Sequence, residues 1–174
     1  MNNDRQPKHA WPPWLKSLVI GRHPRRTLWR IGGLVVVCFV TFRFVLLPVR
    51  VEGESMWPTY RNHRINFINR LAYLRHEPRR GDVVGIRLAG WRVMFMKRIV
   101  GLPGETVAFH GGRLYINRQL VPEPYVRTPC NWELPPEQLG PDEYFVVGDN
   151  RGMAVQDHWL GATSRARIMG KVLL

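Results

Sequence analysis

The stretch Thr106-Val-Ala-Phe-His-Gly-Gly-Arg-Leu-Tyr-Ile-Asn117 carries the clearest structural signal in the chain. Two runs of alternating apolar and polar residues flank Gly111-Gly112, and glycine readily adopts the positive φ angles that a two-residue hairpin turn requires. The alternation predicts antiparallel strands at 106–110 and 113–117. Their shared apolar face carries Val107, Phe109, Leu114 and Ile116.

Short runs of the same kind lie on both sides of this hairpin. We expect further strands at 83–86, 93–100, 144–147 and 168–173. Sixteen glycines and fourteen prolines favour many turns over long helices. We also expect a loop-rich excursion at about 106–141, which is irregular from Arg118 to Pro141. The predicted fold class is therefore mostly β, with antiparallel sheets.

A continuous apolar run precedes this β region. Residues 31–47 are apolar except for Thr41 and Arg43, and this length is at the short end of what crosses a hydrocarbon core of ~30 Å. Arg43 lies about one turn from the far end, where its guanidinium can reach the interface. The residues that follow offer no small-residue cleavage site of an export signal. We therefore expect one retained transmembrane anchor at 31–48.

Charge predicts the orientation of this anchor. Residues 1–30 form a basic leader with seven Arg or Lys residues against the single acid Asp4. Positive charge favours the cytoplasmic side, so residues 49–174 should form an extracytoplasmic domain. The net charge of +13 suits an anionic lipid surface, and the chain has no nucleic-acid-reading motif. The expected partner is a phospholipid bilayer, with no nucleic acid.

The residues that commonly bind metals or form disulfides show no such pattern. Cys38 lies in the apolar run and Cys130 in a proline-rich loop, so the two thiols have neither disulfide-framework nor metal spacing. His63, His76 and His110 also lack metal-ligand spacing. We expect no metal, no cofactor and a monomer.

Three segments are unusual for structural strands. Val51-Glu-Gly-Glu-Ser-Met-Trp-Pro-Thr59 places a serine between a glycine turn and a proline, which suits a rigid nucleophile. Lys97 lies among apolar neighbours, and burial would lower its pKa toward that of a base at neutral pH. Tyr144-Phe-Val-Val-Gly-Asp-Asn-Arg151 is a β run that ends in a polar turn. Each segment alone also fits an ordinary turn or strand.

Together and in this order, the segments resemble the successive motifs of bacterial type I signal peptidases. The matching stretches are 53–59, Arg80-Gly-Asp-Val-Val84, Lys97-Arg-Ile-Val-Gly-Leu-Pro-Gly-Glu105 and Gly148-Asp-Asn-Arg151. The resemblance covers roughly residues 51–174. It implies a coiled antiparallel β-sheet domain on one N-terminal transmembrane helix.

The resemblance also implies a function and a location. The chain would be a membrane-bound serine endopeptidase of the Ser/Lys type, which removes signal peptides from exported preproteins. It would lie in the cytoplasmic (inner) membrane of a bacterium with its N-terminus in the cytoplasm. Seven residues separate Leu47 from Ser55, so the site would lie within about 30 Å of the bilayer.

The same resemblance assigns roles to individual residues. Ser55 would be the nucleophile and Lys97 the general base, with the Ser55 backbone N–H in the oxyanion hole next to Gly53. Asp149 and Arg151 would support the site. Shallow pockets for small substrate residues at minus one and minus three would be lined by Val51, Met56, Tyr60, Phe95 and Met96.

The chain departs from the family pattern after Arg151. The serine that usually hydrogen-bonds the catalytic lysine aligns with Ala154, and the usual Asp and Arg align with Gln156 and His158. Asp157 or a water molecule could orient Lys97 instead. A triad of Ser55, His158 and Asp149 is a rival hypothesis. Other readings are a peptidase dedicated to a pilin or conjugation protein, and a non-catalytic anchored β module that binds leader peptides.

Overall fold

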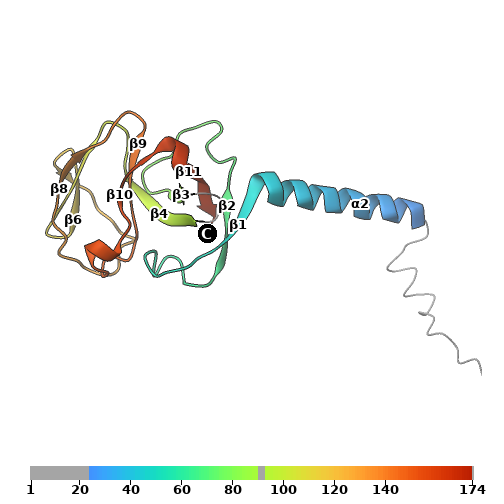
Figure 1. Ribbon diagram of the computed structural model, residues 1–174, viewed down its shortest axis with the longest axis horizontal. Helices are drawn as coiled ribbons and strands as arrows, with labels where there is room; N and C mark the ends of the chain where they lie inside the picture. Colours follow the sequence, from blue (N-terminus) through green and yellow to red (C-terminus); the bar gives the residue numbers. More distant parts are fainter. Residues whose placement is uncertain (1–23, 90–92, 174) are drawn as a thin grey trace, which may run out of the picture. The chain divides into compact units, whose positions relative to one another are not determined.

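The computed structural model describes residues 24–89 and 93–173 (Figure 1). All of its strands pair antiparallel. The helical elements are α2 (Pro24–Val40), a π-helical turn (Thr41–Val45) and two short 3-10 helices, η2 (Val155–Asp157) and η3 (Arg165–Arg167). The strands are β1 (Leu46–Arg50), β2 (Ile65–Asn69), β3 (Val83–Ala89), β4 (Val93–Gly101), β5 (Thr106–His110), β6 (Arg113–Ile116), β7 (Gln119–Leu120), β8 (Leu134–Gln138), β9 (Glu143–Val147), β10 (Gly161–Ser164) and β11 (Ile168–Leu173).

The N-terminal helix forms a unit separate from the β domain, which begins at Phe42. The helical stretch Arg25–Val45 is long and apolar enough to cross a membrane. The structure differs from the predicted anchor at both ends. The helix already includes residues 24–30, and Leu46–Arg50 pair with β2 as strand β1 instead of continuing the apolar helix. The leader before Pro24 lies outside the described residues.

Two antiparallel sheets make up the β domain. The larger sheet has the order β1-β2-β11-β3-β4-β9-β10, and the smaller has the order β7-β6-β5-β8. Figure 1 shows β6 and β8 at one end of the domain and β1 and β2 at the other. This arrangement confirms the predicted mostly β fold class.

The predicted hairpin is formed by β5 and β6, with Gly111 and Gly112 at φ angles of 55° and 72°. Its four predicted apolar residues are all buried, and they pack in one core cluster with residues of the larger sheet such as Val100, Phe145 and Val147. The expected strands near 83, 93, 144 and 168 are also present as β3, β4, β9 and β11. The hairpin therefore joins the two sheets through a common core.

Five strands were not predicted: β1, β2, β7, β8 and β10. β8 lies inside the excursion expected to be irregular, and it contains Pro135 and Pro136. It is an edge strand of the smaller sheet, where a missing backbone donor is tolerated. β1 and β10 are likewise the edges of the larger sheet. Edge strands lack the continuous apolar pattern of central strands, which explains why local patterning missed them.

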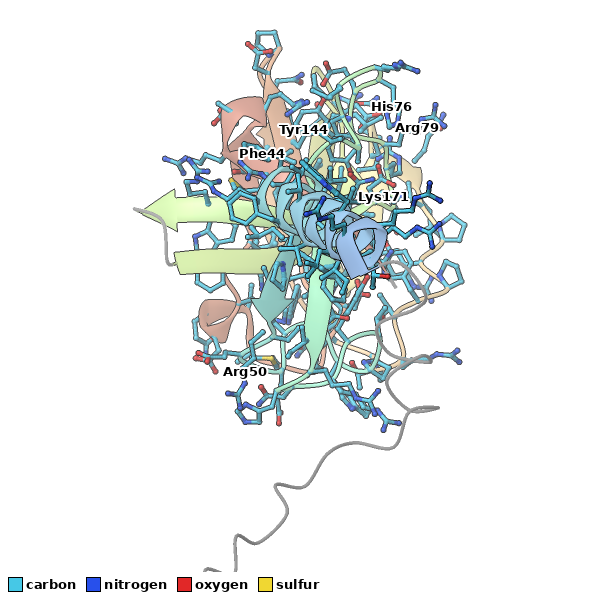
Figure 2. The ribbon with its side chains drawn as sticks, turned by 90° about the vertical axis from the view of Figure 1, so that its right-hand side faces the viewer. Phe44, Arg50, His76, Arg79, Tyr144 and Lys171 are labelled. Carbon is cyan, nitrogen blue, oxygen red and sulfur yellow. The ribbon has the colours of Figure 1, made fainter. Side chains whose placement is uncertain are left out.

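The Arg80-Gly-Asp82 motif has a structural role in this fold. The Asp82 carboxylate accepts hydrogen bonds from the Tyr73 hydroxyl (3.0 Å), the Arg79 backbone N–H (3.1 Å) and Lys171 Nζ (2.6 Å). Figure 2 labels Arg79 and Lys171 among the side chains of this region. Burial raises the pKa of Asp82, but these donors outweigh it and hold the pKa below its usual range. The motif thus ties β11 to the turn that precedes β3.

Gly101 provides a test of the junction between the sheets. A Cβ atom at this position would lie 2.5 Å from Val107 Cγ2 and 2.9 Å from both Leu139 Cδ1 and Phe145 Cβ. We expect Gly101→Ala to lower the free energy of unfolding by about 1–3 kcal/mol, because the packed core must shift. Urea denaturation of the detergent-solubilised protein measures this change. Gly140→Ala is the control, since its Cβ would meet only the flexible Glu143 carboxylate at 3.1 Å. Equal effects of the two substitutions would contradict the packing argument.

Candidate active site

Ser55 lies in a tight loop between β1 and β2. The backbone N–H groups of Trp57 and Tyr60 donate to the carbonyl oxygens of Glu54 (3.0 Å) and Met56 (2.9 Å). Gly53 has a φ of +100°, a conformation that strains other residues, and its N–H donates to Asn62 Oδ1 at 3.1 Å. The Ser55 residue is half-buried. The loop therefore holds the serine at the surface with little conformational freedom.

Lys97 enters the same region from a central strand. It lies on β4, where it pairs with Val84 of β3, and its side chain is only 1% exposed. Burial lowers the pKa of Lys97 to about 8, while the negative charge of Asp149 opposes this shift. A lysine with this pKa is neutral in a useful fraction of molecules near neutral pH. It therefore has the property that a general base requires.

Gly148 explains how the serine loop and the lysine strand meet. Arg98 pairs with Val147, the last residue of β9, and Ile99 pairs with Val146, so continuing this register by one residue would set Gly148 opposite Lys97. Opposite residues in an antiparallel pair direct their side chains to the same face. A Cβ atom on Gly148 would lie 2.2 Å from the Ser55 carbonyl oxygen and 2.6 Å from His158 Cε1. The missing side chain thus leaves room for Ser55 and His158 on the face that Lys97 occupies.

Asn150 fixes the serine loop against the turn that follows β9. Its backbone N–H donates to the Ser55 carbonyl at 3.0 Å, and its Nδ2 donates to the Glu54 carbonyl at 3.1 Å. These two bonds hold the carbonyl groups of both peptides that flank Ser55. The polar turn therefore sets the position of the serine.

Asp149 joins the same turn to β4. Its fully buried carboxylate accepts two hydrogen bonds from Arg98, at 2.8 and 2.6 Å, and one from the Thr59 hydroxyl at 2.6 Å. Arg98 also donates to the Gly81 carbonyl and lies 4.0 Å above the Tyr125 ring. The hydrogen bonds from Arg98 to Asp149 keep the Arg98 pKa raised despite its burial. Sequence reasoning predicted a supporting role for Asp149 but identified neither Arg98 nor Thr59 as its partners.

Arg151 connects the turn to the excursion. Its guanidinium donates to the Gly148 carbonyl at 3.0 Å and to both Glu123 carboxylate oxygens, at 2.9 and 2.5 Å. The group is also stacked near the rings of Phe109 and Trp132. Glu123 lies in the loop after β7, so this ion pair attaches the smaller sheet to the site. Glu123 was not identified from the sequence, because nothing local marks an acid whose partner is 28 residues away.

A pocket of about 330 Å³ opens beside Ser55. Four of the five residues predicted to contact substrate line it: Val51, Met56, Phe95 and Met96. Gly85 lies at its floor next to Ile68, whose Cδ1 atom would be 2.4 Å from a Cβ at position 85. The volume and partly apolar lining suit small side chains.

Tyr60 is placed differently from the prediction. It does not line the pocket, and it packs in the core with Met56, Ile68 and Val83. Burial raises its pKa to about 12, so its hydroxyl stays protonated. The residue follows the serine loop closely in sequence, but the loop directs its side chain inward.

The structure does not bring Asp157 into the orienting role predicted for it at Lys97. Ala154 and Asp157 are exposed, and neither has a hydrogen bond to Lys97 within the described residues. Among those residues, no hydrogen bond joins Asp149 to His158, whose Nε2 instead lies 2.7 Å from the Asn150 carbonyl oxygen. The arrangement of a Ser/His/Asp triad is therefore not present. No hydrogen bond within residues 24–89 and 93–173 joins Ser55 to Lys97, so the dyad remains a prediction.

Comparisons with known proteins point to one family. Residues 25–174 match the family described as signal peptidase, peptidase S26. The chain is 32% identical to a signal peptidase I of Leptolyngbya laminosa, over 82% of this chain and 74% of that protein. It is 31% identical to signal peptidase I S of Bacillus subtilis strain 168, over 90% and 84%. A crystal structure of a signal peptidase I from Enterococcus faecalis V583 matches with a TM-score of 0.47 and 25% identity, covering 56% of this chain and 97% of that one.

The burial of Lys97 makes a prediction about stability. Its pKa is about 8 in the folded protein against 10.5 for the free side chain. Below pH 8 Lys97 is charged in both the folded and the unfolded chain, and the folded protein bears the full desolvation penalty of the ammonium group. Between pH 8 and 10.5 only the unfolded chain keeps the proton, so wild-type stability rises with pH. We expect Lys97→Met to be more stable than wild type by about 3 kcal/mol at pH 7.

Paired urea titrations of the wild type and Lys97→Met from pH 7 to 10.5 measure this difference. The stability advantage of Lys97→Met should shrink as the pH rises, because the wild type gains stability as Lys97 loses its proton. The other titrating groups are common to both proteins, so their contributions cancel. A constant difference across this range would show that the pKa of Lys97 is not depressed.

Proposed function

The chain belongs to the signal peptidase family, peptidase S26, and from this premise we propose that it is a membrane-anchored serine endopeptidase that removes signal peptides. One observation above all supports the proposal. Lys97 is buried with a pKa lowered to about 8, and its strand neighbours Phe95 and Met96 line the same pocket as Ser55. These are the parts required for acyl transfer by a serine with a lysine base.

In the proposed reaction, Ser55 Oγ attacks the scissile carbonyl while the neutral Lys97 amine takes the hydroxyl proton. The resulting ammonium then protonates the leaving amine, which leaves an ester on Ser55. Water, deprotonated by the same lysine, hydrolyses this ester and restores the enzyme. Each proton that Lys97 accepts is returned, so the cycle needs no cofactor.

The Ser55 backbone N–H would stabilise the oxyanion. No backbone hydrogen bond within the described residues uses this N–H group. Gly53 has open space around its Cα and adds no side chain to that side of the loop. The donor is therefore available to the negative charge that develops on the substrate oxygen.

The substrate would be the end of a signal peptide in extended form. The pocket lined by Val51, Met56, Phe95 and Met96 would accept the small residues that precede the cleaved bond. The helical stretch Arg25–Val45 would anchor the enzyme in the bacterial cytoplasmic membrane, with the β domain outside. This placement suits preproteins whose leader is still in the lipid.

We expect Ser55→Ala and Lys97→Ala each to reduce cleavage at least about a thousandfold, because nucleophile and base act as a unit. The detergent-solubilised protein is incubated with a leader-bearing precursor, and the new N-terminus of the product is sequenced. Ser164→Ala, on the distant edge strand β10, is the matched control and should cleave at the wild-type rate. Turnover near wild type in either site variant would disprove the dyad. Absence of cleavage by the wild type, together with an unreactive Ser55 toward a fluorophosphonate probe, would favour a non-catalytic module.

The pH profile tests the identity of the base. Cleavage should increase as the pH rises through about 8, where Lys97 loses its proton, and it should remain high in mild alkali. The rate constant kcat/KM, measured from pH 5 to 10, reports this ionisation in the free enzyme. A rise governed by a group below pH 6.5 would instead indicate a histidine base.

A further inference from the structure

His158 is enclosed beside the site, and one of its ring nitrogens lacks a partner. The side chain is only 6% exposed, and Trp132 contacts it edge-on at 4.9 Å between ring centroids. Nε2 lies 2.7 Å from the Asn150 carbonyl oxygen, which can only accept, so Nε2 carries the ring proton. In this neutral tautomer Nδ1 is an acceptor. Nδ1 is enclosed and has no hydrogen-bond partner among the described residues.

The backbone places this ring on the face of the Lys97 side chain. Gly148 follows Val147, the last residue of β9, which pairs with Arg98 next to Lys97, and His158 Cε1 would lie 2.6 Å from a Cβ atom at Gly148. Cε1 lies between Nδ1 and Nε2 in the ring, so this edge of the imidazole occupies the space that the missing side chain leaves, and Nδ1 is one bond away from it. Cross-strand Cβ atoms are typically about 5 Å apart, a distance that a lysine side chain easily spans.

The Lys97 amine is an available hydrogen-bond donor. Its amine has no hydrogen bond within the described part of the chain, and Nζ lies 5.9 Å from the centroid of the Phe95 ring. A buried acceptor without a partner loses free energy until it is paired, and the Lys97 amine is a donor that can pair with it. Hydrogen bonds of catalytic groups often tighten only when substrate is bound, so a change of lysine rotamer can complete this pair.

We propose that neutral His158 is a positioning residue, which accepts a hydrogen bond through Nδ1 from the Lys97 amine and directs the amine lone pair toward Ser55. This inference rests on the proposed function. It assigns to the histidine the orienting role that the exposed Ala154 cannot supply. The imidazole neither gains nor loses a proton in the cycle. It holds one N–H of the amine, and then one N–H of the ammonium, while Lys97 exchanges protons with Ser55 and the leaving group.

The charges around His158 keep it an acceptor. Burial chiefly lowers its pKa, and the positive charges of Lys97 and Arg151 lower it further. The bond to the Asn150 carbonyl and the negative charge of Asp157 oppose this shift but do not cancel it. The ring is therefore neutral at the pH at which Lys97 works as a base.

Two amide substitutions separate the two ring nitrogens. The side-chain oxygen of His158→Asn reaches the position of Nδ1, whereas the side-chain nitrogen of His158→Gln reaches the position of Nε2. We expect His158→Gln to lower kcat at least about tenfold with little change in KM, because it loses the bond to a charged amine. His158→Asn keeps an acceptor and should lose no more than about threefold.

The pH profile distinguishes positioning from support of the fold. An acceptor stabilises the ammonium more than the amine, so its loss in His158→Gln should move the acid limb of kcat toward lower pH. His158→Asn should move it less. The reverse ranking, with His158→Gln near the wild-type rate and His158→Asn strongly impaired, would show that only the bond to the Asn150 carbonyl matters and would overturn the proposal.

A measurement without turnover keeps the proposal testable if either variant fails to fold. In protein labelled with ¹⁵N-histidine, the Nδ1 resonance of His158 should differ between the wild type and Lys97→Met at pH 9, because the latter has no donor. Identical resonances would overturn the inference even if the enzyme cleaves precursor. A lack of cleavage by the wild type with a resonance difference would instead reject the proposed function and retain the contact.

Discussion

The hydrogen-bonded ion pair between Arg98 and the buried Asp149 is the interaction on which the site depends. Asp149 begins the turn after β9, Arg98 lies in the centre of β4, and Thr59 ends the serine loop, so one carboxylate joins three segments. Removal of one partner of such a pair leaves an uncompensated buried charge and typically costs about 3–5 kcal/mol. With this ion pair in place, neighbouring Gly148 packs against the Ser55 carbonyl, and neighbouring Asn150 donates hydrogen bonds to the carbonyls of Glu54 and Ser55. The Arg98–Asp149 ion pair and the residues of the candidate site are thus neighbours on β4 and on the segment that follows β9.

Burial of the Lys97 amine destabilises the folded state, and the packing of the surrounding sheet offsets this loss of free energy. The larger sheet places β4 between β3 and β9, so the lysine backbone is held on both sides while its side chain loses hydration. The same burial that destabilises the folded state lowers the pKa of the amine and gives it the character of a base. Stability and reactivity are therefore opposed at this residue, as is common where a site requires an ionisable group in an apolar environment.

The smaller sheet also supports the site, although it contributes none of the reacting groups. The buried Arg151 bridges the Gly148 carbonyl to Glu123, and its guanidinium lies against Phe109 and Trp132 of that region. Trp132 in turn contacts the ring of His158 and donates from Nε1 to the Met153 carbonyl. The loop-rich excursion is in this way attached to the segment 148–158 by charge, ring stacking and hydrogen bonds. Its presence explains how a turn with a short 3-10 helix can hold His158 in a fixed orientation.

Local sequence patterns predicted the hairpin at 106–117, strands β3, β4, β9 and β11, the apolar N-terminal helix and, through the motifs, the family and the candidate residues Ser55 and Lys97. These features are local: alternation, glycine pairs and apolar runs act over a few residues. Tertiary structure alone decided the edge strands, the inward position of Tyr60, and the partners of Asp149, Arg151 and His158. Thr59 and Asp149 are 90 positions apart and Glu123 and Arg151 are 28 apart. Such pairs depend on strand register, which no short stretch of sequence contains. The space left by the missing side chain at Gly148, which Ser55 and His158 occupy, likewise forms only once β4 and β9 are paired.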